Sequence, residues 1–586
     1  MLSIVYRKSF LRCLLLLSVC SSVWRCANPV TPEGGPRDVT PPKVVKCNPP
    51  NLSTHFKGTT IQIDFEEFIN LKNSASDILI SPPLINPPDY KLRGKSVIIK
   101  LEDSLKANTT YVFTFGKSIT DITENNVLTD FSYVLSTGAY LDSLSLKGIV
   151  VNAFDLTPQK EIFVFLYIDN SDTIPFDSLP VKVPPYYITK TGDNGEFLFK
   201  NLQDAPFKLL ALNDQNSNLI FDQLSEKIAF YDTLIHPYFI PPPDTSKKDS
   251  SKTVSMKKDT AAINNPGDSL PSSTGSSFEL RLFEEIDSTQ RILKKSVIGD
   301  GMVLFLFRYP VKKPHFRPFN LDSTKTRMIT ELFPKKDSII LWMSGQKCDS
   351  LYIEVSDNDI VLDTAKLDLK KKISKKKSSA KDSLPDRLRI IAGKSNIFNH
   401  FKNNYECSIS YPLDRWNFSR VLLIEDKDTL HPEIYFSDSI KRKIIVKHKW
   451  KEEKRYKMIF PDSIIYGINN LTNDSVKIEF TTRAQKDFGS LILDLNFDAS
   501  PGNYIIQLLT EKENLVEEQF INKSSKVRFD YVLPGKFKIK VILDRNRNKN
   551  WDTGNYRKNL QPEQVRYFSK TLEIRANWDV EETWNW

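Results

Sequence analysis

The sequence predicts an all-β protein made of several Ig-like and other β-sandwich domains in tandem. The chain has 586 residues, which is too long for a single hydrophobic core, and its length suggests about four domains. Its apolar runs are short, rich in Val, Ile, Phe and Tyr, and separated by Pro, Asn, Asp and Gly clusters, as expected for strands and turns. Two pairs of internal repeats extend this pattern over most of the chain.

The N-terminus has the form of a secretory signal. Three basic residues, Arg7, Lys8 and Arg12, come first. They precede the apolar run CLLLLSV (13–19), which is too short to span a membrane. We therefore expect residues 1–25 to be a signal peptide and the chain to be exported.

The residues after Cys26 carry a family resemblance. The stretch CANPVTPEGGPRDVTPP resembles the start of Bacteroidota lipoproteins with SbsA-type Ig-like domains, in which a lipidated Cys precedes a tether rich in Pro and Gly. The resemblance implies lipid attachment at Cys26, a tether at 26–42 and a place at the outer membrane. Cys20 remains an alternative, because the residues just before Cys26 make a poor lipobox. The lack of an acidic cluster after Cys26 favours the periplasmic face over the cell surface.

The first repeat pair predicts two Ig-like domains. Residues 96–138 align with 443–483, and each copy contains an alternating strand, an Asn-rich turn and a final strand. Three apolar positions match without a gap: Tyr111, Phe115 and Ile119 with Tyr456, Phe460 and Ile464. The layout resembles the SbsA-type Ig-like domain, so we expect one such domain at 43–138 and a divergent copy at 387–484.

The second repeat pair predicts two further sandwiches. Residues 195–214 align with 525–544 with one inserted residue. In each copy two strands, joined by a turn that contains Leu, run directly into an Asp. This pattern resembles the carboxypeptidase regulatory-like or prealbumin-like β-sandwich, a fold that is usually non-catalytic. We expect one such domain at 139–240 and another at 485–586.

The remaining segments are a fifth domain and two linkers. Strand-like runs fill 278–366, which predicts a β-sandwich without a family resemblance. The low-complexity stretches 241–277 and 367–386 cannot bury enough surface to fold and are expected to be linkers. Much of the Lys excess behind the net charge of +10 lies in these stretches. Because it is not spread over an aromatic platform, we expect no nucleic-acid binding.

Two loops share the pattern Asp-x-Asn-x-Asn-x-x-x-Asp, DQNSNLIFD at 214–222 and DRNRNKNWD at 544–552. Oxygen side chains at alternate positions fit a weak calcium site, with four ligands in the first copy: Asp214, Asn216, Asn218 and Asp222. However, position 6 lacks Gly, position 12 lacks Glu, and the second loop carries Arg and Lys. Asx-turns at the end of a strand explain the same residues. We interpret the loops as a recurring turn, with calcium as the alternative.

No catalytic or cofactor-binding pattern stands out. The six His residues are scattered without metal spacing or a partnership with Ser or Cys, and no Gly-rich phosphate loop follows a strand. We therefore expect neither enzyme activity nor a cofactor. Outside the N-terminal segment, Cys47, Cys348 and Cys407 are widely spaced and odd in number, so they define no disulfide framework.

A short tripeptide, Asp-Ser/Thr followed by a residue that is mostly aliphatic, recurs through the chain. It resembles the O-glycosylation sequon of exported Bacteroidota proteins. The resemblance implies glycosylation of linker sites such as Thr260 and Ser269. Turn chemistry is the competing explanation, because Asp-Ser pairs favour bends before strands.

These observations favour a non-enzymatic lipoprotein that acts as a modular envelope scaffold and contacts other envelope proteins. One alternative is an adhesin-like protein that binds glycans or a surface ligand through exposed Trp residues. The candidates are Trp551, Trp578, Trp584 and Trp586, for which core packing is the competing explanation. A second alternative is an accessory part of an envelope enzyme, which would require a pocket lined by convergent polar groups.

Overall fold

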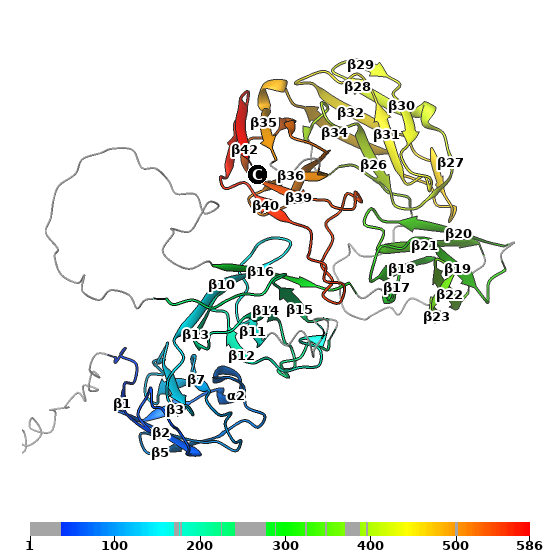
Figure 1. Ribbon diagram of the computed structural model, residues 1–586. Coiled ribbons are helices and arrows are strands. Elements are labelled where there is room, and N and C mark those ends of the chain that lie inside the picture. Colours follow the sequence, from blue (N-terminus) through cyan, green and yellow to red (C-terminus); the bar gives the residue numbers. More distant parts are fainter. Residues whose placement is uncertain are drawn as a thin grey trace, which may run out of the picture.

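The computed structural model is a chain of consecutive β-sandwiches, which confirms the all-β prediction. It describes residues 37–168, 175, 178–223, 225–240, 277–286, 289–322, 325–345, 348–369, 387–393, 397–497 and 502–585. In these ranges the helices are single turns, and none is long and apolar enough to cross a membrane. We number the sandwiches from first to fifth in chain order (Figure 1).

The first sandwich packs two sheets around an aromatic core. Its elements are β1 (Val44–Asn48), β2 (Thr60–Phe65), β3 (Ile69–Leu71), α2 (Ser74–Asp77), β4 (Leu79–Ser81), β5 (Asp89–Arg93), β6 (Ser96–Lys100), β7 (Thr110–Thr114), β8 (Ile119–Asp121) and β9 (Ser132–Ser136). The sheets have the orders β1-β2-β6-β5 and β4-β7-β9, and β3 pairs with β8. Tyr111, Phe113 and Phe115 are buried, as the alternation of a half-buried strand requires.

The second sandwich takes its last strand from beyond a long insertion. Its strands are β10 (Leu144–Asn152), β11 (Phe163–Ile168), β12 (Tyr187–Lys190), β13 (Glu196–Leu202), β14 (Phe207–Leu212), β15 (Lys227–Phe230) and β16 (Phe278–Glu284). They follow the order β12-β11-β14-β15-β16-β10-β13. β16 pairs in parallel with β10 and antiparallel with β15. Gly148 on β10 allows this approach, since a Cβ there would lie 2.3 Å from the carbonyl oxygen of Phe278.

This pairing corrects the predicted boundaries around the insertion. The sequence predicts a separate domain at 278–366, but its first residues form β16 of the second sandwich. The predicted domain at 139–240 therefore lacks its last strand, and the stretch 241–277 is inserted within a sandwich rather than placed between two. The error has a physical cause, because β16 pairs with Gly148–Asn152, far away in sequence. Local periodicity identifies a strand but not such a distant partner.

The third sandwich has two sheets on an aliphatic and aromatic core. Its strands are β17 (Ile292–Gly299), β18 (Met302–Phe307), β19 (Pro314–Pro318), β20 (Thr326–Leu332), β21 (Ser338–Gly345), β22 (Ser350–Asp357) and β23 (Ile360–Asp368). The sheet orders are β17-β18-β21-β20 and β19-β22-β23. β23 includes the first two residues of the stretch 367–386, which the sequence predicts to be a linker.

The fourth sandwich repeats the hydrogen bonds of the first. Its elements are β24 (Ile390–Ile391), β25 (Ile397–Phe398), β26 (Tyr405–Ile409), β27 (Leu413–Trp416), η3 (Phe418–Arg420), β28 (Leu422–Glu425), β29 (Asp428–Leu430), β30 (Glu433–Phe436), β31 (Lys443–Lys447), β32 (Arg455–Phe460), β33 (Ile465–Gly467) and β34 (Val476–Thr482). The Tyr456 hydroxyl accepts from the Lys451 backbone N–H at 2.9 Å, as that of Tyr111 does from Lys106 at 2.9 Å. The two copies therefore share one register.

The fifth sandwich repeats most strand pairings of the second, but its sheets are separate and it has the additional strand β41. Its elements are η4 (Gln485–Asp487), β35 (Gly489–Asn496), β36 (Tyr504–Thr510), β37 (Leu515–Ile521), β38 (Ser525–Val532), β39 (Gly535–Leu543), β40 (Val565–Tyr567), β41 (Leu572–Ile574) and β42 (Asp579–Asn585). β35 pairs antiparallel with β38 and in parallel with β42. β10 pairs in the same way with β13 and β16.

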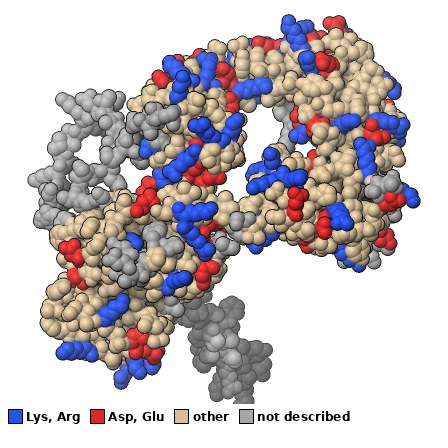
Figure 2. Space-filling model, turned by 45° about the vertical axis from the view of Figure 1, so that its right-hand side comes forward, with Lys and Arg blue, Asp and Glu red and all other residues tan. Residues whose placement is uncertain are grey.

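The second to fifth sandwiches form a closed ring. Figure 1 shows the fifth sandwich returning to the second, and Figure 2 shows an opening through the ring with Lys and Arg side chains on its rim. The third and fourth sandwiches share a hydrophobic cluster that contains Trp342 and Tyr411, whose ring centroids lie 5.4 Å apart. The fourth and fifth meet where the rings of Phe401 and Tyr531 stack at 4.6 Å.

Candidate functional site

The loop DQNSNLIFD follows β14 and is held by its own polar side chains. The Asp214 carboxylate accepts backbone N–H groups from Ser217 at 2.7 Å and Leu219 at 2.8 Å. The side-chain amides of Asn216 and Asn218 donate to the Asp222 carboxylate at 3.2 and 2.7 Å. The four residues of the candidate calcium site therefore do lie together, joined by hydrogen bonds to one another and to the backbone.

The loop DRNRNKNWD follows β39 and is held by similar internal bonds. The Asp544 carboxylate accepts the backbone N–H groups of Asn548 at 3.1 Å and Lys549 at 2.9 Å. The side-chain amides of Asn546 and Asn548 donate to Asp552 at 2.7 and 2.6 Å. Both loops thus form Asx-type turns, which is the interpretation favoured by the sequence.

A buried glutamate holds each loop at its base. Glu226 is fully buried, and its carboxylate accepts from the backbone N–H groups of Gln215 and Asp222, both at 3.2 Å. Glu563 is 4% exposed and accepts from those of Arg545 at 2.7 Å and Asp552 at 3.1 Å. Burial raises the pKa of Glu563 above its ordinary value.

Neither glutamate stands out in the sequence as a residue that holds a loop. Each lies just before the strand that follows its loop, Glu226 before β15 and Glu563 before β40. An alignment of the two repeats beyond Asp222 and Asp552 would have matched them, but only with a gap.

The chemistry of the loops is that of a polar turn. The carboxylates of Asp214 and Asp222 accept hydrogen bonds within the loop. In the described part of the chain, no group of three or more His, Cys, Asp or Glu side chains is placed to hold a metal ion. Calcium binding by this loop stays the untested alternative to the recurring-turn interpretation.

The two loops differ in length between the last Asp and the glutamate. Three residues (223–225) separate Asp222 from Glu226, whereas ten residues (553–562) separate Asp552 from Glu563, which is seven more. We call the longer segment, 553–562, the strap. It leaves the fifth sandwich and lies against the second.

The strap contacts the second sandwich through buried and polar groups. Tyr556 is fully buried in a cluster with Phe221, Phe230 and Phe283, and its backbone N–H donates to the Glu285 carboxylate. The Thr553 hydroxyl donates to the carbonyl oxygen of Glu284 at 2.7 Å. The Gln561 amide donates to the carbonyl oxygen of Phe230 at 2.9 Å. These bonds make the strap a joint between sandwiches that are far apart in sequence.

An open groove lies beside this joint, with a volume of about 330 Å³. Three sandwiches contribute aromatic side chains to it: Phe154 from the second, Tyr309 from the third and Trp551 from the fifth. The Trp551 indole N–H donates to the carbonyl oxygen of Glu563 at 2.9 Å, and its ring lies 5.1 Å from that of Phe154. Trp551 thus packs inside the joint.

The other candidate Trp residues do not form a platform with Trp551. Trp584, on β42, packs against Phe568 with ring centroids 5.4 Å apart. Trp578 is 61% exposed. Trp586 lies outside the described residues. Packing therefore accounts for Trp551 and Trp584, and Trp578 is the exposed member of the three that are described.

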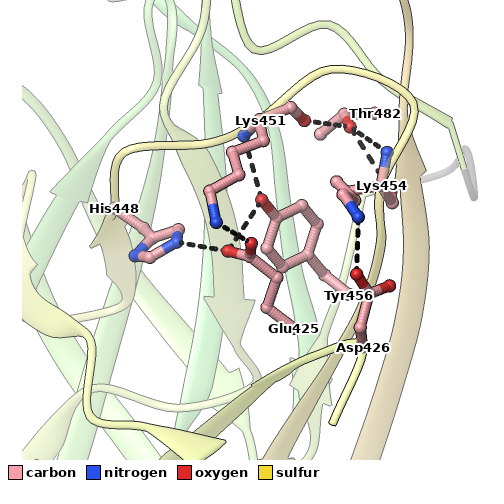
Figure 3. A network of polar contacts seen from close by, with 7 residues as sticks. All are labelled: Glu425, Asp426, His448, Lys451, Lys454, Tyr456 and Thr482. Carbon is pink, nitrogen blue, oxygen red and sulfur yellow. Dashed lines mark hydrogen bonds and ion pairs between the residues drawn. The ribbon is translucent and has the colours of Figure 1, made fainter. Parts of the chain in front are cut away.

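A polar network lies at one edge of the fourth sandwich (Figure 3). The Glu425 side chain is 7% exposed, forms an ion pair with Lys451, and accepts from the Tyr456 hydroxyl at 3.3 Å. His448 Nε2 lies 3.4 Å from the same carboxylate. Hydrogen bonding from Lys451 holds the pKa of Glu425 below its ordinary value. The network joins β28, β32 and the β31–β32 turn, and we assign it a structural role.

The remaining sequence candidates divide into two groups. Cys47, Cys348 and Cys407 are free cysteines. The predicted lipid site Cys26, its alternative Cys20, and the predicted glycosylation sites Thr260 and Ser269 lie outside the described residues.

Comparison with known proteins identifies one domain. The family model of the bacterial Ig-like domain matches residues 38–137. The chain therefore contains an Ig-like domain at this position, while the SbsA-type subclass and the Bacteroidota origin stay predictions. No curated protein matches the chain.

Solved structures with similar folds are remote. The TIE protein of Bacillus anthracis is 10% identical with a TM-score of 0.15, over 94% of this chain and 76% of that one. BcpA, the major pilin subunit of Bacillus cereus, is 9% identical with a TM-score of 0.15, over 76% of this chain and 99% of that one. The S-layer protein SbsC is 11% identical with a TM-score of 0.13, over 86% and 64%. With TM-scores this low, these likenesses support no inference about function.

Proposed function

We propose that the protein is a non-enzymatic scaffold of the bacterial cell envelope, which holds partner proteins against the faces of its sandwiches. The observation that carries this proposal is the closed ring. Large aromatic side chains lie at its joints: Trp342 and Tyr556 are buried there, and Phe401 is half-buried. A frame built in this way presents many faces for partners and needs no reactive group.

We further propose that lipid on Cys26 anchors this frame to the periplasmic face of the outer membrane, with residues 26–42 as a spacer. The signal-like N-terminus and the family-like tether support this placement. Cys26→Ser should move the full chain from the membrane fraction to the soluble fraction and abolish labelling with a fatty-acid analogue. Cys20→Ser is the matched control and should change neither. The reverse result would assign the anchor to Cys20.

Pull-down of the full chain from native membranes tests the scaffold function. After gentle detergent extraction, mass spectrometry should find the same envelope proteins in repeated experiments, and a lipid-anchored control protein should not retain them. Recovery of no protein beyond that control would overturn the proposal. Glycan binding that is lost in Trp578→Ala, without protein partners, would favour the adhesin-like alternative, because Trp578 is the exposed candidate.

A further inference from the structure

The joint between the second and fifth sandwiches differs from the other joints of the ring. Each of the other pairs is consecutive in the chain, so a covalent connection keeps its members together. The third and fourth also share a cluster with Trp342, and a half-buried ion pair joins Glu331 to Arg442. The second and fifth are held by contacts alone. When the ring opens, this joint is therefore expected to open first.

The strap is not needed for the fold of the sandwich that carries it. The second sandwich makes a similar loop with a buried glutamate at its base, and its sequence has three residues, 223–225, between the last Asp and that glutamate. The core of the fifth sandwich consists of its own strands, with Leu493, Ile506 and Ile539 fully buried, and contains no strap residue. The additional length of the strap therefore serves the joint.

The strap inserts the Tyr556 side chain into a pocket of aromatic rings on the second sandwich, which we call the socket. The Tyr556 ring lies 5.3 Å from that of Phe230 and 6.4 Å from that of Phe221, both on the second sandwich. Gly554 lies against Phe283, since a Cβ there would be 2.6 Å from that ring. The strap itself contributes one fully buried aromatic side chain and a few hydrogen bonds. Beside it, Trp551 packs on Phe154, and Leu156 packs against a small apolar cluster of the fifth sandwich. These contacts bury fewer apolar side chains than the core of either sandwich does.

We propose that the strap is a releasable closure, and that the ring opens at this joint while the second and fifth sandwiches stay folded. Release withdraws Tyr556 from its socket and breaks the hydrogen bonds at Glu284, Glu285 and Phe230. It also dismantles the groove, because Trp551 and Phe154 come from opposite sides of the joint.

Two variants of the full chain test the proposal. Tyr556→Ala empties the socket, and a loop exchange replaces the ten strap residues with the Gln-Leu-Ser that the second sandwich has in their place. Arg557→Ala is the matched control, since Arg557 is an exposed strap residue. Small-angle X-ray scattering reports the ring dimensions, and hydrogen exchange with mass spectrometry reports the strap and the core strands separately.

Both variants should increase the radius of gyration, while Arg557→Ala matches the unmodified chain. In Tyr556→Ala, strap amides should exchange at least about tenfold faster, with β14 and β39 unchanged. Faster exchange in β14 as well would make Tyr556 part of the second sandwich's core and would overturn the proposal. Unchanged scattering in the loop exchange would do the same, because the ring would then close without the strap.

Discussion

The buried glutamate of the second sandwich gives the sharpest test of how these loops are held. The Glu226 carboxylate accepts from three backbone N–H groups, those of Gln215, Asp222 and Gln223, each at 3.2 Å. Glu226→Gln keeps the shape of the side chain but replaces one oxygen with an amide NH₂. The glutamine oxygen retains the two donors that share Oε2. The Gln215 N–H loses its acceptor, and the other two N–H groups then donate to a neutral oxygen instead of a charged one.

The expected cost follows from these bonds. Losing one hydrogen bond to a buried charged group costs about 1.5–3 kcal/mol, and the loss of charge weakens the other two by roughly 0.5 kcal/mol in total. We therefore expect a loss of about 2–3.5 kcal/mol in the free energy of local opening, which is roughly 30- to 300-fold faster exchange at about 1.4 kcal/mol per factor of ten.

Hydrogen exchange of the full chain is the appropriate assay, because a protein of several domains has no single unfolding free energy. Amides of β14 and β15, which flank the loop, should show the change. Glu196→Gln on β13 is the control, since Glu196 is exposed in the same sandwich. If Glu226→Gln changes exchange no more than Glu196→Gln does, the glutamate does not hold the loop.

Three further predictions concern charge and pH. Asp214→Ala should destabilise the loop by about 0.5–2 kcal/mol, as the loss of a helix cap does, because backbone N–H groups lose their acceptor. Millimolar calcium should not shift the melting temperature of the unmodified chain, and a calcium-dependent shift that Asp214→Ala abolishes would establish a metal site. The pKa of Glu425 is lowered, so the stability that Glu425 gives the fourth sandwich is present above pH 4.5 and is lost as the pH falls through the lowered value. Glu425→Gln should flatten this pH dependence of stability in urea unfolding monitored by hydrogen exchange. Lys540 Nζ lies 3.2 Å from the centroid of the Phe154 phenyl group across the joint, and burial lowers the pKa of Lys540 to about 8. Because the closed joint favours the neutral amine, closure of the ring of sandwiches should strengthen as the pH rises above 8. Lys540→Met should remove this pH dependence of the radius of gyration measured by scattering.

Local patterns allowed the strands and the repeats to be predicted from the sequence. The alignment of Tyr111 with Tyr456 corresponds to the same bond in both copies, from the backbone N–H five residues earlier. This bond lies within one turn and one strand, so a short stretch of sequence encodes it. The Asp and Asn residues of the two loops were predictable for the same reason, because Asx-turns join residues a few positions apart.

Contacts between distant segments could not be predicted in this way. The partners of β16 lie before the insertion, and the socket of Tyr556 lies on another sandwich. Glu226 and Glu563 are buried because the strands beside them pack into a sandwich core. The periodicity of the sequence around a charged residue does not show that this residue is buried. Tertiary packing, rather than propensity, determines all of these features.

The duplicated sandwiches show which features belong to the shared fold and which belong to one copy. The copies share the bonds that hold the fold, such as those to Tyr111 and Tyr456, and differ at their edges. One difference is the neighbour of this Tyr on the adjacent strand. In the first sandwich Ser81 pairs with Val112, which places Pro82 beside Tyr111. In the fourth sandwich Glu425, which forms an ion pair, is the strand partner of Tyr456. The fifth sandwich has the ten-residue strap where the second has three residues. Because the fold tolerates the shorter loop, selection for stability of the single sandwich does not explain the longer one. The contacts of the strap with the second sandwich explain its length. We therefore expect substitutions at this joint to alter the closure of the ring while each sandwich stays folded.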